Sequence, residues 1–155
     1  MTSSMRAFTL LEVMLSLAAI AVIAGISLPV YQSFQVRNDM DIAATTIAQS
    51  CRRAAVLAQA SDGDTSWGVR IQSGSITLFK GASYVTRDAT FDEFFSMPTS
   101  ITPSGLSEIV FAKFTGMPTA TGTTTLTSSI NENRTISINA KGMVSYYTPH
   151  IMKPN

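Results

Sequence analysis

The chain has 155 residues, 45% of them hydrophobic, and a formal net charge of +1 at pH 7. That length suits one modest domain, and so small a net charge lacks the basic field of a dedicated nucleic-acid binder. The single cysteine, Cys51, excludes an intrachain disulfide, and the single histidine, His150, excludes a histidine-rich metal cluster.

The first predicted element is a long apolar helix that begins at Phe8. No charged residue occurs from Val13 to Val36, a stretch of about 36 Å as a helix, which is enough to cross a bilayer. We therefore expect a transmembrane helix over residues 8–36, with a kink or a melted stretch at Pro29, because proline removes a backbone donor. Glu12 lies near the start of this apolar helix, and a carboxylate in a membrane-spanning segment is energetically costly, so its presence needs an explanation.

The second predicted element is an amphipathic helix over residues 37–60. Its apolar face repeats at spacings of four and three residues, through Met40, Ala44, Ile47, Cys51, Ala54 and Ala58. Ser61-Asp62-Gly63 follows as a stop signal. Because Cys51 lies on the apolar face, a buried structural thiol is the better interpretation than a reactive one.

From Trp67 onward the period of the pattern changes to two, which is typical of strands. Residues 67–72 and 75–80 predict a hairpin, residues 108–114 a third strand, residues 122–129 a Thr-rich strand, and residues 134–147 a closing hairpin around Lys141-Gly142. Residues 83–103 show no regular pattern, and the tail 148–155 is expected on the surface.

These elements predict an α+β fold in which one long N-terminal helix packs on an antiparallel β-sheet domain. The first half of the helix is expected to be transmembrane and the second half amphipathic. The expected divisions are residues 1–7, 8–36 and 37–155, with the β-rich part over residues 66–147.

Catalytic and metal-binding patterns are weak throughout the chain. Asp62-Gly63-Asp64 suits calcium, but a turn that ends the helix explains it better, since the full calcium-loop signature is absent. Asp92-Glu93 could form an acid/base pair, but a solvated turn is the simpler interpretation. His150 has no partner by spacing. We therefore expect no enzyme activity, no metal and no cofactor.

Three explanations of the N-terminus stay open on these grounds alone. A secretory signal peptide is disfavoured by the length of the apolar run and by Glu12. A simple membrane anchor fits the length but leaves Glu12 unexplained. Cleavage between Ala7 and Phe8 would place a free amine one helical turn from Glu12, so that Glu12 could pair with the Phe8 amine of a neighbouring copy.

The run Ala7-Phe8-Thr9-Leu10-Leu11-Glu12-Val13, followed by an apolar helix with Pro29, resembles the class III leader and N-terminal helix of type IV pilins and type II secretion pseudopilins. The resemblance implies that prepilin peptidase removes residues 1–7, that Phe8 is N-methylated, and that Glu12 and Pro29 serve assembly.

The segments "SWGVRI…ITLF" and "RTISINAKGMVSYY" resemble the GspH/FimT group of minor pseudopilins and minor pilins, and Cys51 alone cannot form the C-terminal disulfide loop of major pilins. The resemblance implies a structural minor subunit of a type II secretion pseudopilus or type IV pilus. The alternative is a tip-located minor pilin whose β-domain binds DNA, a surface or a secreted substrate. Expected partners are other subunits, prepilin peptidase and the inner membrane, which the chain would cross once with its globular domain outside the cytoplasm. Nucleic acid is disfavoured, because basic residues are few.

Overall fold

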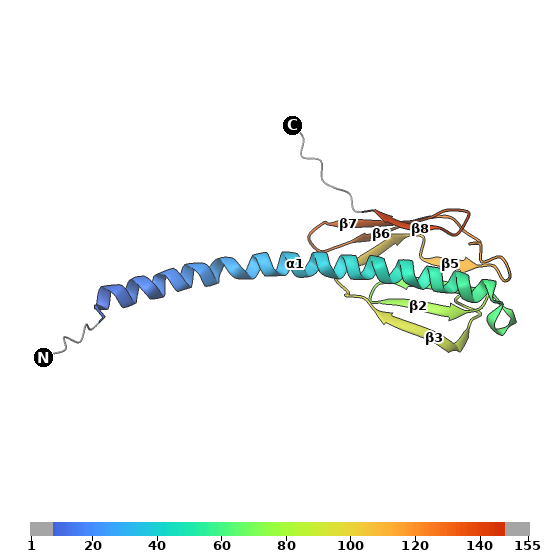
Figure 1. Cartoon of the computed structure of the whole chain (residues 1–155), viewed down its shortest axis with the longest axis horizontal. Coiled ribbons are helices and arrows are strands. Elements are labelled where there is room, and N and C mark those ends of the chain that lie inside the picture. Colours follow the sequence, from blue (N-terminus) through green and yellow to red (C-terminus); the bar gives the residue numbers. More distant parts are fainter. Residues whose placement is uncertain (1–7, 148–155) are drawn as a thin grey trace, which may run out of the picture. The chain divides into compact units, whose positions relative to one another are not determined.

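The computed structural model describes residues 8–147, apart from the side chains of residues 26–30. Ala7, on one side of the expected cleavage site, and the tail with His150 lie outside the described residues. The chain divides into two compact units, Met1–Gln35 and Val36–Asn155, called unit 1 and unit 2 below. One helix, α1 (Leu10–Gln59), contributes to both units (Figure 1).

The transmembrane part of the expected fold is wrong. Within the described residues, none of the helices combines the length and the apolarity needed to cross a membrane. Glu12, in the first turn of α1, places a carboxylate in the apolar run, and a carboxylate inside a bilayer is costly. The expected single-pass location in the inner membrane has no support in the structure.

Of the kink or melted stretch expected at Pro29, the melted stretch is wrong, because α1 is helical from Leu10 to Gln59, and the kink stays a prediction. A proline removes only one intrahelical hydrogen bond, so the helix can continue on both sides of it.

In unit 2, α1 packs its apolar face against two sheets, where a single sheet was expected. Figure 1 shows β2 and β3 on one side of the helix and β6, β7 and β8 on the other. The shared core holds the predicted helix stripe together with side chains from both sheets, namely Met40, Ala44, Ile47, Cys51, Ala54, Ala58, Val69, Ile76, Leu78, Leu126 and Ile136. The stripe therefore lies where both inner faces meet.

The first sheet is antiparallel, with strand order β3-β2-β1-β5. Its strands are β1 (Trp67–Gln72), β2 (Ser75–Lys80), β3 (Asp88–Ser96) and β5 (Glu108–Phe111). Strand β3 lies where no regular pattern was seen, because it is an edge strand and exposes Phe91 and Phe94. The third predicted strand ends at Phe111 and not at Phe114, since Phe114 takes the left-handed conformation with φ 67°.

The second sheet has strand order β4-β6-β7-β8. Its strands are β4 (Thr102–Gly105), β6 (Gly122–Thr127), β7 (Asn133–Ile138) and β8 (Val144–Tyr147), all antiparallel to their neighbours. After α1, the chain forms the short 3-10 helix η1 (Asp62–Asp64), and Asp64 forms an ion pair with Lys113. The Asp62-Gly63-Asp64 segment is thus a turn after the helix, as predicted.

Candidate assembly site

The candidate site is the start of α1 in unit 1, and Thr9 is its N-cap. The Glu12 backbone N–H donates to Thr9 Oγ1 at 3.3 Å and to the Thr9 carbonyl at 3.1 Å. These bonds occupy a donor that a helix N-terminus otherwise leaves unsatisfied. Thr9 was not singled out from the sequence, although Thr-x-x-Glu before an apolar run is the capping-box signature.

Glu12 occupies the first turn of α1, where the helix dipole favours a negative charge. Its side chain is exposed, and within the described residues its carboxylate has no hydrogen-bond or ion-pair partner. Phe8 precedes the helix and is 78% exposed, so the position of the expected new N-terminus is accessible.

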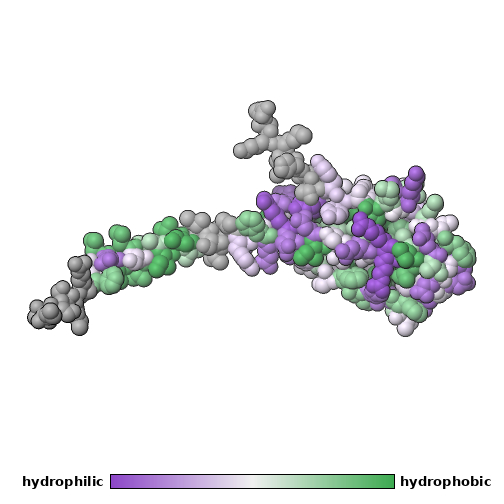
Figure 2. Space-filling view, in the orientation of Figure 1, coloured by the Kyte–Doolittle hydropathy of each residue, from purple (hydrophilic) through white to green (hydrophobic). Residues whose placement is uncertain are grey.

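The apolar side chains that follow are exposed on all sides of the helix. Figure 2 shows this part of the chain largely in the green of hydrophobic residues. The large ones after Glu12 are Val13, Met14, Leu15, Leu17, Ile20, Val22 and Ile23, and Phe8, Leu10 and Leu11 precede it. An ordinary surface helix carries one apolar stripe, whereas a helix that is apolar all round is stable only when other groups surround it. Unit 1 therefore presents a surface that needs partners.

Small residues allow such partners to approach closely. A Cβ atom placed on Gly25 would meet nothing within 4 Å, so this position is open on the helix surface. Ser16 does not add a free polar group, since its hydroxyl donates to the Glu12 carbonyl at 2.7 Å. The segment after Glu12 thus offers a neighbouring helix an apolar surface with little unsatisfied polarity.

The acidic pair Asp92-Glu93 lies in strand β3 and not in the solvated turn expected from the sequence. Asp92 is only 2% exposed and binds Arg87 Nε at 2.7 Å, which raises the pKa of that guanidinium. Glu93 makes two bonds to Arg53 on α1, at 2.7 and 2.6 Å. Each acid has its own arginine: Asp92 binds the residue just before β3, and Glu93 attaches β3 to α1.

Cys51 is buried and free, as predicted, and its burial raises the pKa of the thiol to about 12. In the part of the chain that the structure describes, no group of three or more histidine, cysteine or acidic side chains is placed to hold a metal ion.

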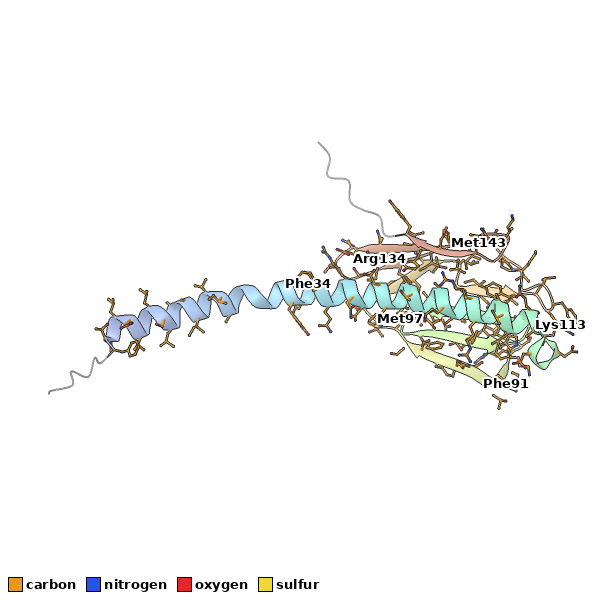
Figure 3. All side chains as sticks on the ribbon, viewed as in Figure 1. Phe34, Phe91, Met97, Lys113, Arg134 and Met143 are labelled. Carbon is orange, nitrogen blue, oxygen red and sulfur yellow. The ribbon has the colours of Figure 1, made fainter. Side chains whose placement is uncertain are left out.

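Another charged cluster ties α1 to the hairpin between β6 and β7. Arg134, labelled in Figure 3, donates from Nε to Asp41 at 2.7 Å and lies 3.5 Å from Glu132, which in turn accepts from Arg37 at 2.8 Å. These four charges alternate in sign and hold the start of unit 2 in one position on its own sheet.

Comparison with protein families, with curated proteins and with solved structures found no match to this chain.

Proposed function

We propose that this protein is a structural minor subunit of a filament of the type II secretion pseudopilus or type IV pilus kind, and that it assembles through unit 1. The observation that supports this proposal best is the exposed apolar surface around the start of α1. Burying one large apolar side chain contributes about 1.5–3 kcal/mol, so packing copies of this helix side by side releases a large free energy.

Glu12 explains how such packing acquires a defined register. Apolar contacts alone allow helices to slide, because they are not directional. A carboxylate without a partner, in the first turn of an apolar helix, gains most from the position that brings it to a cation. After cleavage between Ala7 and Phe8, the Phe8 amine of the neighbouring copy is that cation.

Incorporation into filaments tests the proposal. Glu12→Gln keeps the size of the side chain and removes its charge, and Asp62→Asn is the matched control, because it makes the same change at an exposed acid in unit 2. We expect both proteins to accumulate in the native host. Filaments sheared from the cells should contain the control at the wild-type level and at least tenfold less of the Glu12 variant.

Two results would contradict parts of this proposal. If Glu12→Gln entered filaments as well as the wild-type chain does, the proposed ion pair between subunits would be wrong. If the wild-type chain were absent from every sheared filament fraction, the proposed filament function itself would be wrong. Intact-mass analysis of the same fractions should show a chain that begins at Phe8 and carries one methyl group.

A further inference from the structure

Strand β3 is the open edge of the first sheet. It ends the strand order β3-β2-β1-β5 and lies at the outer margin of that sheet in Figure 1. The opposite edge is covered, because Phe111 forms a bridge with Pro118 and the Thr119 N–H donates to the Val110 carbonyl at 2.8 Å. Among the described residues, no other strand pairs with β3 on the side away from β2. An edge strand of this kind is a template on which another strand can pair.

The backbone groups of β3 that face outward follow from its pairing with β2. The Met97 N–H donates to the Gly74 carbonyl at 3.1 Å, directly after the strand and in the same register. In an antiparallel pair the bonded residues alternate, so every second residue back from Met97 also bonds β2. The N–H and C=O groups of Phe94 and Ser96 therefore point away from β2, as does the C=O of Asp92.

These outward groups are accessible. Phe94 is 66% exposed, and Ser96 is exposed as well. Asp92 is half-buried as a residue although its side chain is only 2% exposed, so the part that it exposes is its backbone. Nearer the start of the strand, the Thr90 N–H already bonds the Asp88 carboxylate at 3.1 Å. The accessible, unused part of the edge therefore covers residues 92–96, which we call the open edge.

The open edge has no free charge to repel an incoming strand. Natural edge strands are often protected by charged side chains. Here Asp92 bonds Arg87 and Glu93 bonds Arg53, both within the same chain. Each acid is thus neutralised by its own arginine, and this form of protection is absent from the open edge.

The open edge is complementary to a second copy of itself. When two copies pair antiparallel about Phe94, the N–H and C=O groups of each Phe94 bond those of the other, and each Ser96 N–H bonds the Asp92 carbonyl opposite. The same register places the two Phe94 rings next to each other on one face, where aromatic pairs stabilise a sheet. It also keeps the acids apart, because Asp92 lies opposite Ser96 and Glu93 lies opposite Phe95.

We propose that unit 2 forms a two-fold symmetric dimer in which the open edges of two copies pair about Phe94. The two first sheets then join into one, in the strand order β5-β1-β2-β3-β3-β2-β1-β5. The contact uses no residue of unit 1, so it goes beyond the function proposed above. Filament incorporation tests that function and dimerisation tests this contact, so either proposal can fail without the other.

Substitutions at position 94 test both the contact and its register. Phe94→Lys and Phe94→Glu change an exposed side chain and leave the backbone bonds between β2 and β3 in place. In a dimer paired about Phe94, each variant places like charges directly opposite each other, which is destabilising. A mixture of the two variants instead places a lysine opposite a glutamate.

Sedimentation equilibrium of the purified full chain measures the dimer, in a density-matched mild detergent that covers the apolar surface of unit 1. We expect a reversible dimer of the wild-type chain. Each single variant should raise the Kd of the dimer about tenfold or more, and the equimolar mixture should return to within about threefold of wild type. Phe114→Lys is the matched control, because Phe114 is 69% exposed and lies outside β3, and it should dimerise as wild type does.

A second pair of variants separates backbone pairing from side-chain contact. Proline has no N–H and is tolerated in an edge strand where that N–H faces solvent. Phe94→Pro should therefore keep the circular dichroism spectrum of the folded chain and lose the dimer. Phe94→Ala keeps the N–H and should weaken the dimer less than Phe94→Pro does.

Three results would overturn the proposal. A wild-type chain that stays monomeric at every concentration would leave the open edge to a strand from another protein. Single variants that dimerise as tightly as wild type would place the contact on another surface. A mixture of Phe94→Lys and Phe94→Glu that dimerises as weakly as either variant alone would exclude pairing about Phe94.

Discussion

Arg134 Nε and Asp41 Oδ1 lie 2.7 Å apart, and this ion pair joins strand β7 to helix α1 although Arg134 is only 8% exposed (Figure 3). A guanidinium so far from water needs its acceptors, because an uncompensated buried charge is strongly destabilising.

Replacing Asp41 should therefore destabilise unit 2. We expect Asp41→Asn to lower the free energy of unfolding by about 1–3 kcal/mol, since it weakens a charge-assisted hydrogen bond and leaves Arg134 with Glu132 and a carbonyl. Glu93→Gln is the comparison, because its partner Arg53 is much more exposed than Arg134, and the pair should contribute about 0–1 kcal/mol. Urea unfolding followed by circular dichroism measures both. If the two variants lost equal unfolding free energy, the burial of Arg134 would not be the cause of the destabilisation.

Gly68 is expected to tolerate no side chain. A Cβ atom there would lie 2.4 Å from Phe79 Cζ and 2.9 Å from the Ile109 carbonyl, and the carbonyl cannot move without shifting β5. We expect Gly68→Ala to lower the melting temperature, with a loss of about 1–3 kcal/mol in stability. Gly25→Ala is the matched control, because its position is open and alanine favours a helix. An unchanged melting temperature for Gly68→Ala would contradict the close approach of the Phe79 ring.

The buried thiol of Cys51 should make stability depend on pH in alkaline solution. Its pKa is raised to about 12 in the folded state from 9.0, so the unfolded chain loses this proton first as pH rises. The stabilising contribution is complete below pH 9 and should fall by about 1.4 kcal/mol per pH unit between pH 9 and pH 12. Cys51→Ala should unfold with a shallower alkaline dependence and cost about 1–3 kcal/mol at neutral pH for lost packing.

Thiol labelling gives an independent measurement of the same residue. Native protein should react slowly with a thiol reagent and denatured protein fast, because Cys51 is buried. Rapid native labelling would show that the core opens around this position.

Unit 2 should fold without the apolar helix start. A chain of residues 37–155 keeps the core residues of α1 and both sheets. We expect it to be soluble and to melt cooperatively, with a circular dichroism spectrum of mixed helix and strand. An insoluble product, or a melt without a clear transition, would show that residues before Arg37 are needed for the core.

Thr9 should stabilise the start of the helix, whereas Glu12 should be needed for assembly. Thr9→Ala removes the cap and should cost about 0.5–2 kcal/mol of local helix stability, whereas Thr9→Ser keeps the hydroxyl and should behave as wild type. Hydrogen exchange at the amide of Glu12 measures the effect, because that amide is the capped donor. If Thr9→Ala left this exchange rate unchanged, the hydroxyl would not be the acceptor.

The pattern of apolar and polar residues was enough to predict the elements in which that pattern repeats at short, regular spacings. The Met40–Ala58 stripe lies in the core, and the hairpin of β1 and β2 pairs Gln72 with Ser75, because neighbouring residues decide such turns and faces. The burial of Cys51 followed from its place on that stripe. The cap by Thr9 was equally local and could have been predicted from the capping-box signature.

What only the tertiary structure decided depends on contacts between distant parts of the chain. The sequence alone predicted one sheet, a transmembrane start to the helix and a solvated turn at Asp92-Glu93, and all three were wrong. Strand β3 is a strand because β2 supplies its hydrogen bonds, and Glu93 meets Arg53 only after β3 is placed beside α1. Thr125 and Thr135 likewise lie side by side only because register aligns β6 with β7. The period of the pattern predicts which face of a strand a residue lies on. The order and register of strands depend on pairing between residues far apart in the sequence, which no short stretch of sequence contains.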